Sequence, residues 1–176
     1  MSVAGDASSV WGFESPESKD DDDVPGKGSD MNVQATESQI LLNRPAEMSE
    51  CNFNDSRIDE GIALFNAGEF FACHDVLEDF WGELTCPEKP FFQGLIQAAV
   101  ALYHFEEGNH GGARRMARSC CVYLRPFVPS CGGIDVERLL TDLEACFQEL
   151  LEEHASYPAH LKVDPEKIPK IYREAR

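Results

Sequence analysis

Apolar residues recur at helical spacing along most of the chain after residue 53. In the segment 56–67 they include Ile58, Ile62 and Phe65, three or four positions apart, which places them on one face of an α-helix. Glycine and proline residues interrupt the spacing and act as helix stops. We therefore predict an all-α fold of about five helices, over residues 56–67, 69–84, 90–107, 110–127 and 135–154.

The third predicted helix is apolar almost all round, so we expect it to be central. The loops between helices are short, which favours antiparallel neighbours. Two segments, Ala63-Leu64-Phe65 before Gly68 and Ala101-Leu102-Tyr103 before Gly108, look like two copies of one helix-turn-helix plan. This favours stacked, tetratricopeptide-like hairpins, with a four-helix bundle as the alternative.

The connection between the second and third helices, Thr85-Cys86-Pro87-Glu88, has the spacing of a capping box.

The chain has 7 cysteines and no C-x-x-C pair. Disulfide-rich secreted domains usually have an even count and a small size. We therefore predict reduced thiols in an intracellular protein. The N-terminus lacks the basic and apolar pattern of a signal peptide and is acidic for a transit peptide, so we expect the cytoplasm, with an organelle lumen as the alternative.

The first 50 residues differ from the rest of the chain in charge and in apolar content. Residues 1–50 contain 11 acidic and 3 basic side chains, including the run Asp20–Asp23, and few apolar ones. Such a segment cannot bury enough apolar area to offset its ordering entropy. We predict a disordered acidic tail at 1–52, either regulatory or simply solvated, then a helical domain at 53–155 and a proline-rich extension at 156–176 with at most one short helix.

The net charge of −17 argues against nucleic acid and against an anionic membrane surface as partners. No run approaches the 18 or so consecutive apolar residues of a membrane-spanning helix. A protein partner is therefore the expected kind of partner.

A polar set interrupts the second predicted helix. His74, Glu78 and Trp81 stand at i, i+4 and i+7, on the same side as the apolar Phe70 and Leu77. Burying an imidazole or a carboxylate without a partner costs roughly 1–3 kcal/mol or more. Trp81 suits either the core or a lid over a pocket.

The third predicted helix offers candidate partners, because Gln93, Gln97 and His104 form one narrow polar stripe on it. If the second and third helices pack antiparallel, this stripe and the His74–Glu78 pair converge.

Three hypotheses could explain these polar residues. The favoured one is a buried structural network of hydrogen bonds. The second is a transition-metal site formed by His74, Glu78 and His104. The third is a ligand or catalytic pocket with His74 and Glu78 as an acid–base pair.

The fourth predicted helix carries a positive strip. Arg114, Arg118 and Arg125 share a face, with Arg115 and His110 nearby. Such a strip can hold a phosphate or an acidic segment, for example Asp20–Asp23 of the same chain. The alternative is ordinary ion pairing with Glu106, Glu107 or the end of the fifth helix.

Several separated motifs resemble the domain of unknown function 309 family, over about residues 57–140. They are Leu64-Phe65-Asn66-x-Gly68-x-Phe70-Phe71-x-x-His74-x-x-x-Glu78-x-x-Trp81, Phe92-Gln93-Gly94-Leu95-Ile96-Gln97, His104 and Gly108-Asn109. The resemblance implies a small all-helical domain found in bacteria, archaea and photosynthetic eukaryotes, without an established activity. The photosynthetic members imply the plastid stroma as the alternative location. It marks His74, Glu78, Trp81, Gln93, Gln97 and His104 as signature positions. Asp75 departs from the family, which commonly has Glu there, and the acidic tail lies outside the family pattern.

The favoured function from the sequence is a non-enzymatic protein-interaction or scaffold module with a buried His/Glu/Gln network. No cofactor is predicted. The alternative is a small metal- or ligand-binding enzyme that uses His74, Glu78 and His104.

Overall fold

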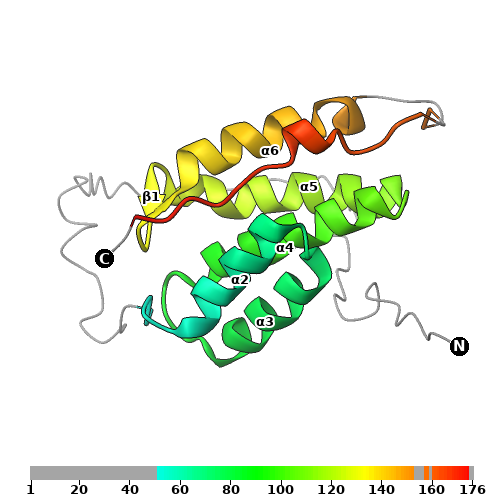
Figure 1. The fold of residues 1–176 in the computed structure, drawn as a ribbon. Coiled ribbons are helices and arrows are strands. Elements are labelled where there is room, and N and C mark those ends of the chain that lie inside the picture. Colours follow the sequence, from blue (N-terminus) through cyan, green and yellow to red (C-terminus); the bar gives the residue numbers. More distant parts are fainter. Residues whose placement is uncertain (1–50, 153–156, 159, 175–176) are drawn as a thin grey trace, which may run out of the picture. The chain divides into compact units, whose positions relative to one another are not determined.

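The computed structural model describes residues 51–152, 157–158 and 160–174. The predicted acidic tail lies outside these residues, except for its last two positions. The described part contains five α-helices and little strand (Figure 1), so the predicted all-α fold is confirmed. Their bounds lie within three residues of the predicted ones: α2 (Ser56–Ala67), α3 (Phe70–Glu83), α4 (Lys89–Glu106), α5 (His110–Leu124) and α6 (Val136–Leu151).

Local capping explains why the helices begin and end where they do. The carboxylate of Asp55 accepts a hydrogen bond from the backbone N–H of Arg57 at 3.0 Å and caps α2. Asp135 caps α6 in the same way, accepting from the N–H of Arg138 at 2.9 Å. Gly68 ends α2 in the left-handed conformation, with φ of 86°.

The helices pack mainly in chain order, each against the next one along the sequence. Figure 1 shows α2 and α3 on one side, α6 on the other, and α4 and α5 between them. The third predicted helix is central, as expected: most of the residues of α4 are buried. It approaches α5 closely, because a Cβ placed on Gly94 would lie 2.8 Å from Cγ of Leu124. This succession of neighbouring antiparallel helices agrees with stacked helical hairpins.

The connection between α5 and α6 contains a short 3₁₀-helix and a hairpin that were not predicted. The last turn of the predicted fourth helix is the 3₁₀-helix η2 (Arg125–Phe127), and an antiparallel hairpin of β1 (Ser130–Cys131) and β2 (Ile134–Asp135) follows it. Strands of two residues have no periodicity to recognise in a sequence. The Gly132-Gly133 turn, with φ of 57° and 81°, supplies the backbone freedom that this hairpin needs.

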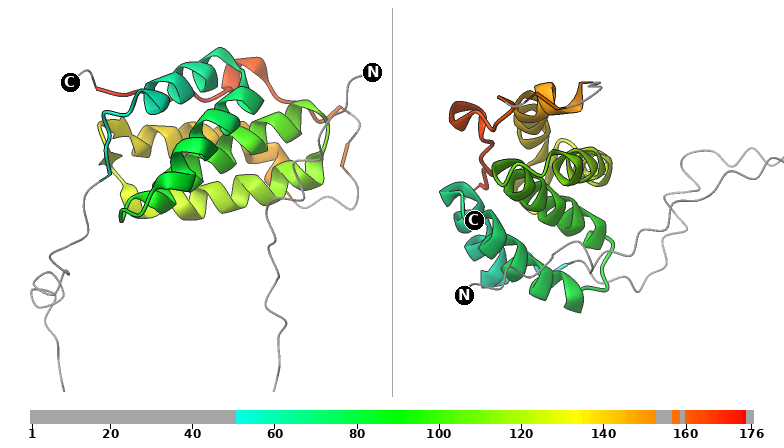
Figure 2. Two further views of the ribbon diagram at one scale, coloured as in Figure 1. Left: turned by 90° about the horizontal axis from the view of Figure 1, so that it is seen from below. Right: turned by 90° about the vertical axis from the view of Figure 1, so that its right-hand side faces the viewer.

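The C-terminal segment, defined here as residues 157–158 and 160–174, returns along α6 to this hairpin (Figures 1 and 2). It contains only the short 3₁₀-helix η3 (Pro165–Lys167). Asn66 of α2 binds it through its side-chain amide, which donates to the carbonyl of Ile171 at 2.9 Å and accepts from its N–H at 2.8 Å. Arg173 donates to the backbone carbonyls of Phe53 and Gly132. Segments far apart in the chain are thereby joined.

The prediction that all cysteines are reduced is wrong for two of them. Cys51 and Cys86 form a disulfide, with their Cα atoms 5.3 Å apart. The pairing follows from the antiparallel α2–α3 hairpin, which brings the start of α2 and the end of α3 to the same end. The other five cysteines are free, and burial raises the pKa of three of these thiols, Cys73, Cys131 and Cys146, to about 12.

Candidate functional site

His74 lies on α3 between two carboxylates of its own helix. Its Nδ1 hydrogen-bonds Oδ1 of Asp75 at 3.0 Å, and its Nε2 lies 3.3 Å from Oε2 of Glu78. The His74 side chain is only 12% exposed, whereas both carboxylates are more accessible. Each ring nitrogen of His74 therefore faces a carboxylate oxygen, which accepts a hydrogen bond.

Aromatic side chains flank this imidazole. Phe71 of α3 is 46% exposed, although it is a large apolar residue. Its ring centroid lies 6.1 Å from that of His74 and 5.5 Å from that of Tyr103 on α4. The α3 patch, as we call Phe71, His74, Asp75, Glu78 and Tyr103, therefore combines an exposed aromatic ring with two carboxylates across two neighbouring helices.

The acidic side of α3 continues toward its C-terminal end, where it holds an arginine. Arg57 of α2 donates to Oδ2 of Asp79 at 2.8 Å and to Oε2 of Glu83 at 2.7 Å, and it also binds Asp55. These hydrogen bonds, that of Asp55 foremost, raise the pKa of the guanidinium above its usual value. Asp79 and Glu83 are thus engaged with α2, whereas Asp75 and Glu78 face His74.

The other predicted site residues are spread along the α3–α4 pair. Trp81 lies near the end of α3, with Nζ of Lys89 4.3 Å from its ring centroid. Gln97 is 7% exposed, and its Oε1 has no hydrogen-bond partner among the described residues. Gln93 is half-buried. The polar contacts of His74 and Glu78 stay within α3, and no hydrogen bond between described residues joins them to Gln93 or Gln97.

The three residues of the predicted metal site do not form a compact cluster of donor atoms in the described part of the chain. His104 lies at the end of α4, where Nδ2 of Asn109 is 3.4 Å from its Nδ1. Within the described part of the chain, the donor atoms that gather within 4.8 Å of one another belong to Cys51, Cys86 and Glu88, and not to His74, Glu78 and His104. The use of His74, Glu78 and His104 in ligand binding stays a prediction.

Two arginines of the predicted positive strip, Arg114 and Arg125, bind groups on α6 or at its end. Arg114 donates to the backbone carbonyl of Glu152 at 2.6 Å, at the C-terminal end of that helix. Arg125 pairs with Glu144 at 3.1 Å. Arg118 is exposed, and no ion pair joins it to an acidic side chain of the described residues. Arg114 therefore binds the end of the fifth predicted helix through a backbone carbonyl, and not through the predicted ion pair.

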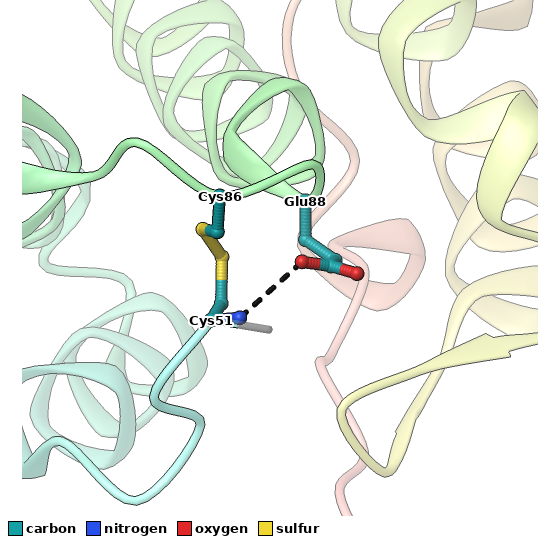
Figure 3. Close-up of side chains that lie close together, drawn as sticks. All are labelled: Cys51, Cys86 and Glu88. Carbon is teal, nitrogen blue, oxygen red and sulfur yellow. Dashed lines mark hydrogen bonds between the residues drawn. A yellow bond between two sulfur atoms is a disulfide. The ribbon is translucent and has the colours of Figure 1, made fainter. Parts of the chain in front are cut away.

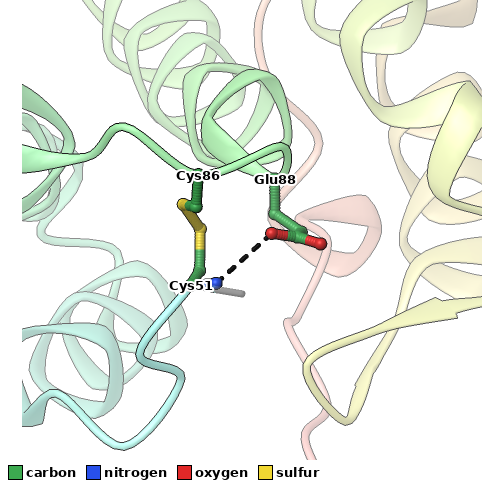
Figure 4. The surroundings of a disulfide bond; sticks show 3 residues. All are labelled: Cys51, Cys86 and Glu88. Atoms are coloured by element: carbon green, nitrogen blue, oxygen red, sulfur yellow. Dashed lines mark hydrogen bonds between the residues drawn. A yellow bond between two sulfur atoms is a disulfide. The ribbon is translucent and has the colours of Figure 1, made fainter. Parts of the chain in front are cut away.

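The sequence analysis missed the grouping of Cys51, Cys86 and Glu88 (Figures 3 and 4). Glu88 caps no backbone group of its own helix, so the predicted capping box with Thr85 is wrong. Instead, its Oε2 accepts a hydrogen bond from the N–H of Cys51 at 3.3 Å. A signal was present in the sequence, because the two cysteines flank a predicted two-helix hairpin at short distances from its ends.

A cavity lies elsewhere, between α6 and the C-terminal segment. It is lined by Phe105, Cys146, Glu149, Lys162, Asp164 and neighbouring residues, and it contains none of the predicted site residues.

Among the described residues, no helix is long and apolar enough to cross a bilayer.

Residues 58–116 match a family model described as "Domain of unknown function (DUF309)". The resemblance to the DUF309 family is confirmed. The matched range contains α3, α4 and all six predicted signature positions. It ends within α5, well before the predicted limit at about residue 140, so α6 and the C-terminal segment lie beyond it.

Two curated proteins are similar to this chain. An uncharacterized protein YpuF from Bacillus subtilis (strain 168) is 29% identical over 119 residues, which cover 66% of this chain and 68% of YpuF. An uncharacterized protein from Aquifex aeolicus (strain VF5) is 31% identical over 88 residues, which cover 49% of this chain and 26% of that protein. Neither name states an activity, so the DUF309 resemblance leaves the function to be argued from the site.

Proposed function

We propose that this DUF309-like domain is a non-enzymatic protein-interaction module that binds a basic segment of a partner at the α3 patch. The observation that carries the proposal is the exposure of Phe71 beside His74 and Tyr103, next to the carboxylates of Asp75 and Glu78. An exposed aromatic ring offers an anchor that gains free energy when a partner covers it.

Charge defines the kind of partner. Asp75 and Glu78 are accessible carboxylates, and the whole chain has a net charge of −17. Lysine or arginine side chains of a partner would be attracted by this field and could pair with the two carboxylates, while an apolar side chain covers Phe71. The partner segment is therefore expected to combine basic residues with one apolar residue.

An array of short peptides tests this proposal. Basic peptides with one central leucine or phenylalanine should bind the full chain, whereas acidic peptides of the same length should not. Phe71→Ser and Glu78→Gln should each weaken binding. Val122→Ser is the matched control, because Val122 is 71% exposed on α5, away from the patch. Equal binding by wild type and Phe71→Ser, or no preference for basic peptides, would contradict the proposal.

A second candidate function rests on the 3.3 Å approach of His74 to Glu78. An imidazole beside a carboxylate can act as an acid–base pair in a small-molecule enzyme, with His104 as a further ligand. This function predicts that His74→Gln abolishes a reaction or the binding of a small molecule while peptide binding through Phe71 persists. Metal analysis of the untagged wild type and of His74→Ala tests its metal-dependent form, because a stoichiometric transition metal lost in the variant would support it.

A further inference from the structure

The disulfide between Cys51 and Cys86 lies beside a carboxylate that neither helix capping nor an ion pair among the described residues explains. Cys51 precedes α2, Cys86 lies in the α3–α4 connection, and Glu88 stands at the start of α4. Figure 3 shows the Glu88 carboxylate turned toward the Cys51 backbone rather than toward α4. Their three ligand atoms lie within 4.8 Å of one another.

We propose that the reduced form of this cluster is a zinc-binding site, with the thiolates of Cys51 and Cys86 and the carboxylate of Glu88 as ligands. Thiolate sulfur and carboxylate oxygen are ordinary ligands of Zn²⁺, and three protein ligands leave the fourth tetrahedral position to water. The three donors carry a charge of −3 when ionised, which outweighs the +2 of the ion and favours its capture.

The positions of Cys51 and Cys86 permit the change from a disulfide to a zinc complex. Zinc–sulfur bonds of about 2.3 Å at a tetrahedral angle separate two thiolate sulfurs by about 3.8 Å. The Cα atoms of Cys51 and Cys86 are 5.3 Å apart, so rotation of the side chains can open the sulfurs to that distance without moving the helices. Among the described residues, Glu88 has only the hydrogen bond from the Cys51 N–H to give up or share.

The disulfide and the zinc complex exclude each other. A dithiol reductant cleaves the S–S bond, its two electrons and two protons yield two cysteine thiols, and the reductant becomes a cyclic disulfide. Zn²⁺ then replaces the two thiol protons, which leave to solvent. The site therefore exists only in the reduced protein, and bound zinc protects both sulfurs from reoxidation.

Metal titration of the full chain tests the proposal. After reduction and removal of metal, the wild type should bind one Zn²⁺ per chain, and the oxidised protein should bind none at this site. Co²⁺ as a probe should give a thiolate-to-cobalt charge-transfer band. Cys51→Ser with Cys86→Ser should lose both signals, and Glu88→Gln, which retains an acceptor for the Cys51 N–H, should weaken zinc binding.

Cys121→Ser is the matched control. Cys121 is a free cysteine outside the cluster, and the neighbouring Cys120 lowers the pKa of its thiol. Its replacement should leave zinc binding unchanged. Alkylation of the reduced wild type, read by mass spectrometry, should show zinc-dependent protection of Cys51 and Cys86 alone, and this readout does not depend on a folded double variant. Absence of zinc binding by the reduced wild type, or protection of other cysteines instead, would overturn the proposal.

Discussion

Reduction of the Cys51–Cys86 disulfide is expected to destabilise the domain by a measurable amount. The bond joins residues 35 positions apart and closes a loop that contains all of α2 and α3. The chain-entropy relation for a loop of this length gives about 4 kcal/mol at 25 °C, and measured values for disulfides are typically about 2–4 kcal/mol. We therefore expect reduction to lower the free energy of unfolding by about 2–4 kcal/mol.

Urea unfolding followed by far-ultraviolet circular dichroism measures this effect. A loss of about 3 kcal/mol corresponds to a fall of about 1–3 M in the urea midpoint for a small protein. The full chain should be compared with and without a reductant, and a chelator should be present so that zinc does not stabilise the reduced form.

Two variants make the comparison specific. Cys51→Ser with Cys86→Ser should unfold near the midpoint of reduced wild type and should not respond to reductant. Cys121→Ser should respond as the wild type does, because its sulfur is not bonded to another cysteine. An identical midpoint for oxidised and reduced wild type would refute the reasoning, since the covalent loop would then make no contribution to stability.

Three further perturbations test the fold. Gly94→Ala places a methyl group against Leu124, where helices α4 and α5 lie close together, and should cost about 1–3 kcal/mol in urea unfolding. Asn66→Ala removes two hydrogen bonds to the C-terminal segment, and should raise amide exchange there in hydrogen–deuterium exchange while costing about 1–3 kcal/mol. The hydrogen bonds from Arg57 lower the pKa of Asp55, so the stability from this carboxylate is present above its unfolded pKa of about 4 and is lost as pH falls through the lower folded value. Asp55→Asn, which keeps a capping oxygen, should flatten that part of an acid-unfolding profile; an unchanged profile would contradict this assignment.

The sequence predicted the local parts of the candidate site and only some of its contacts. The spacing of His74 and Glu78 placed them on one side of a helix, and their side chains do meet across one turn of α3. The partner of His74 on its other ring nitrogen is the adjacent Asp75, a contact that spacing alone does not select. Contacts between helices depend on rotation about each helix axis, which periodicity leaves free. The positions of Gln93 and Gln97 in the sequence therefore could not show whether His74 and Glu78 bind them, and no hydrogen bond between described residues joins them.

The amino-acid sequence by itself determined the number, length and order of the helices, because apolar periodicity, capping residues and glycine stops act within a few neighbouring residues. The tertiary structure alone decided the contacts between distant segments. Asn66 meets Ile171 across 105 positions, and Cys51 meets Cys86 across 35. Such pairs are chosen by the packing of whole helices, which minimises exposed apolar area for the chain as a unit.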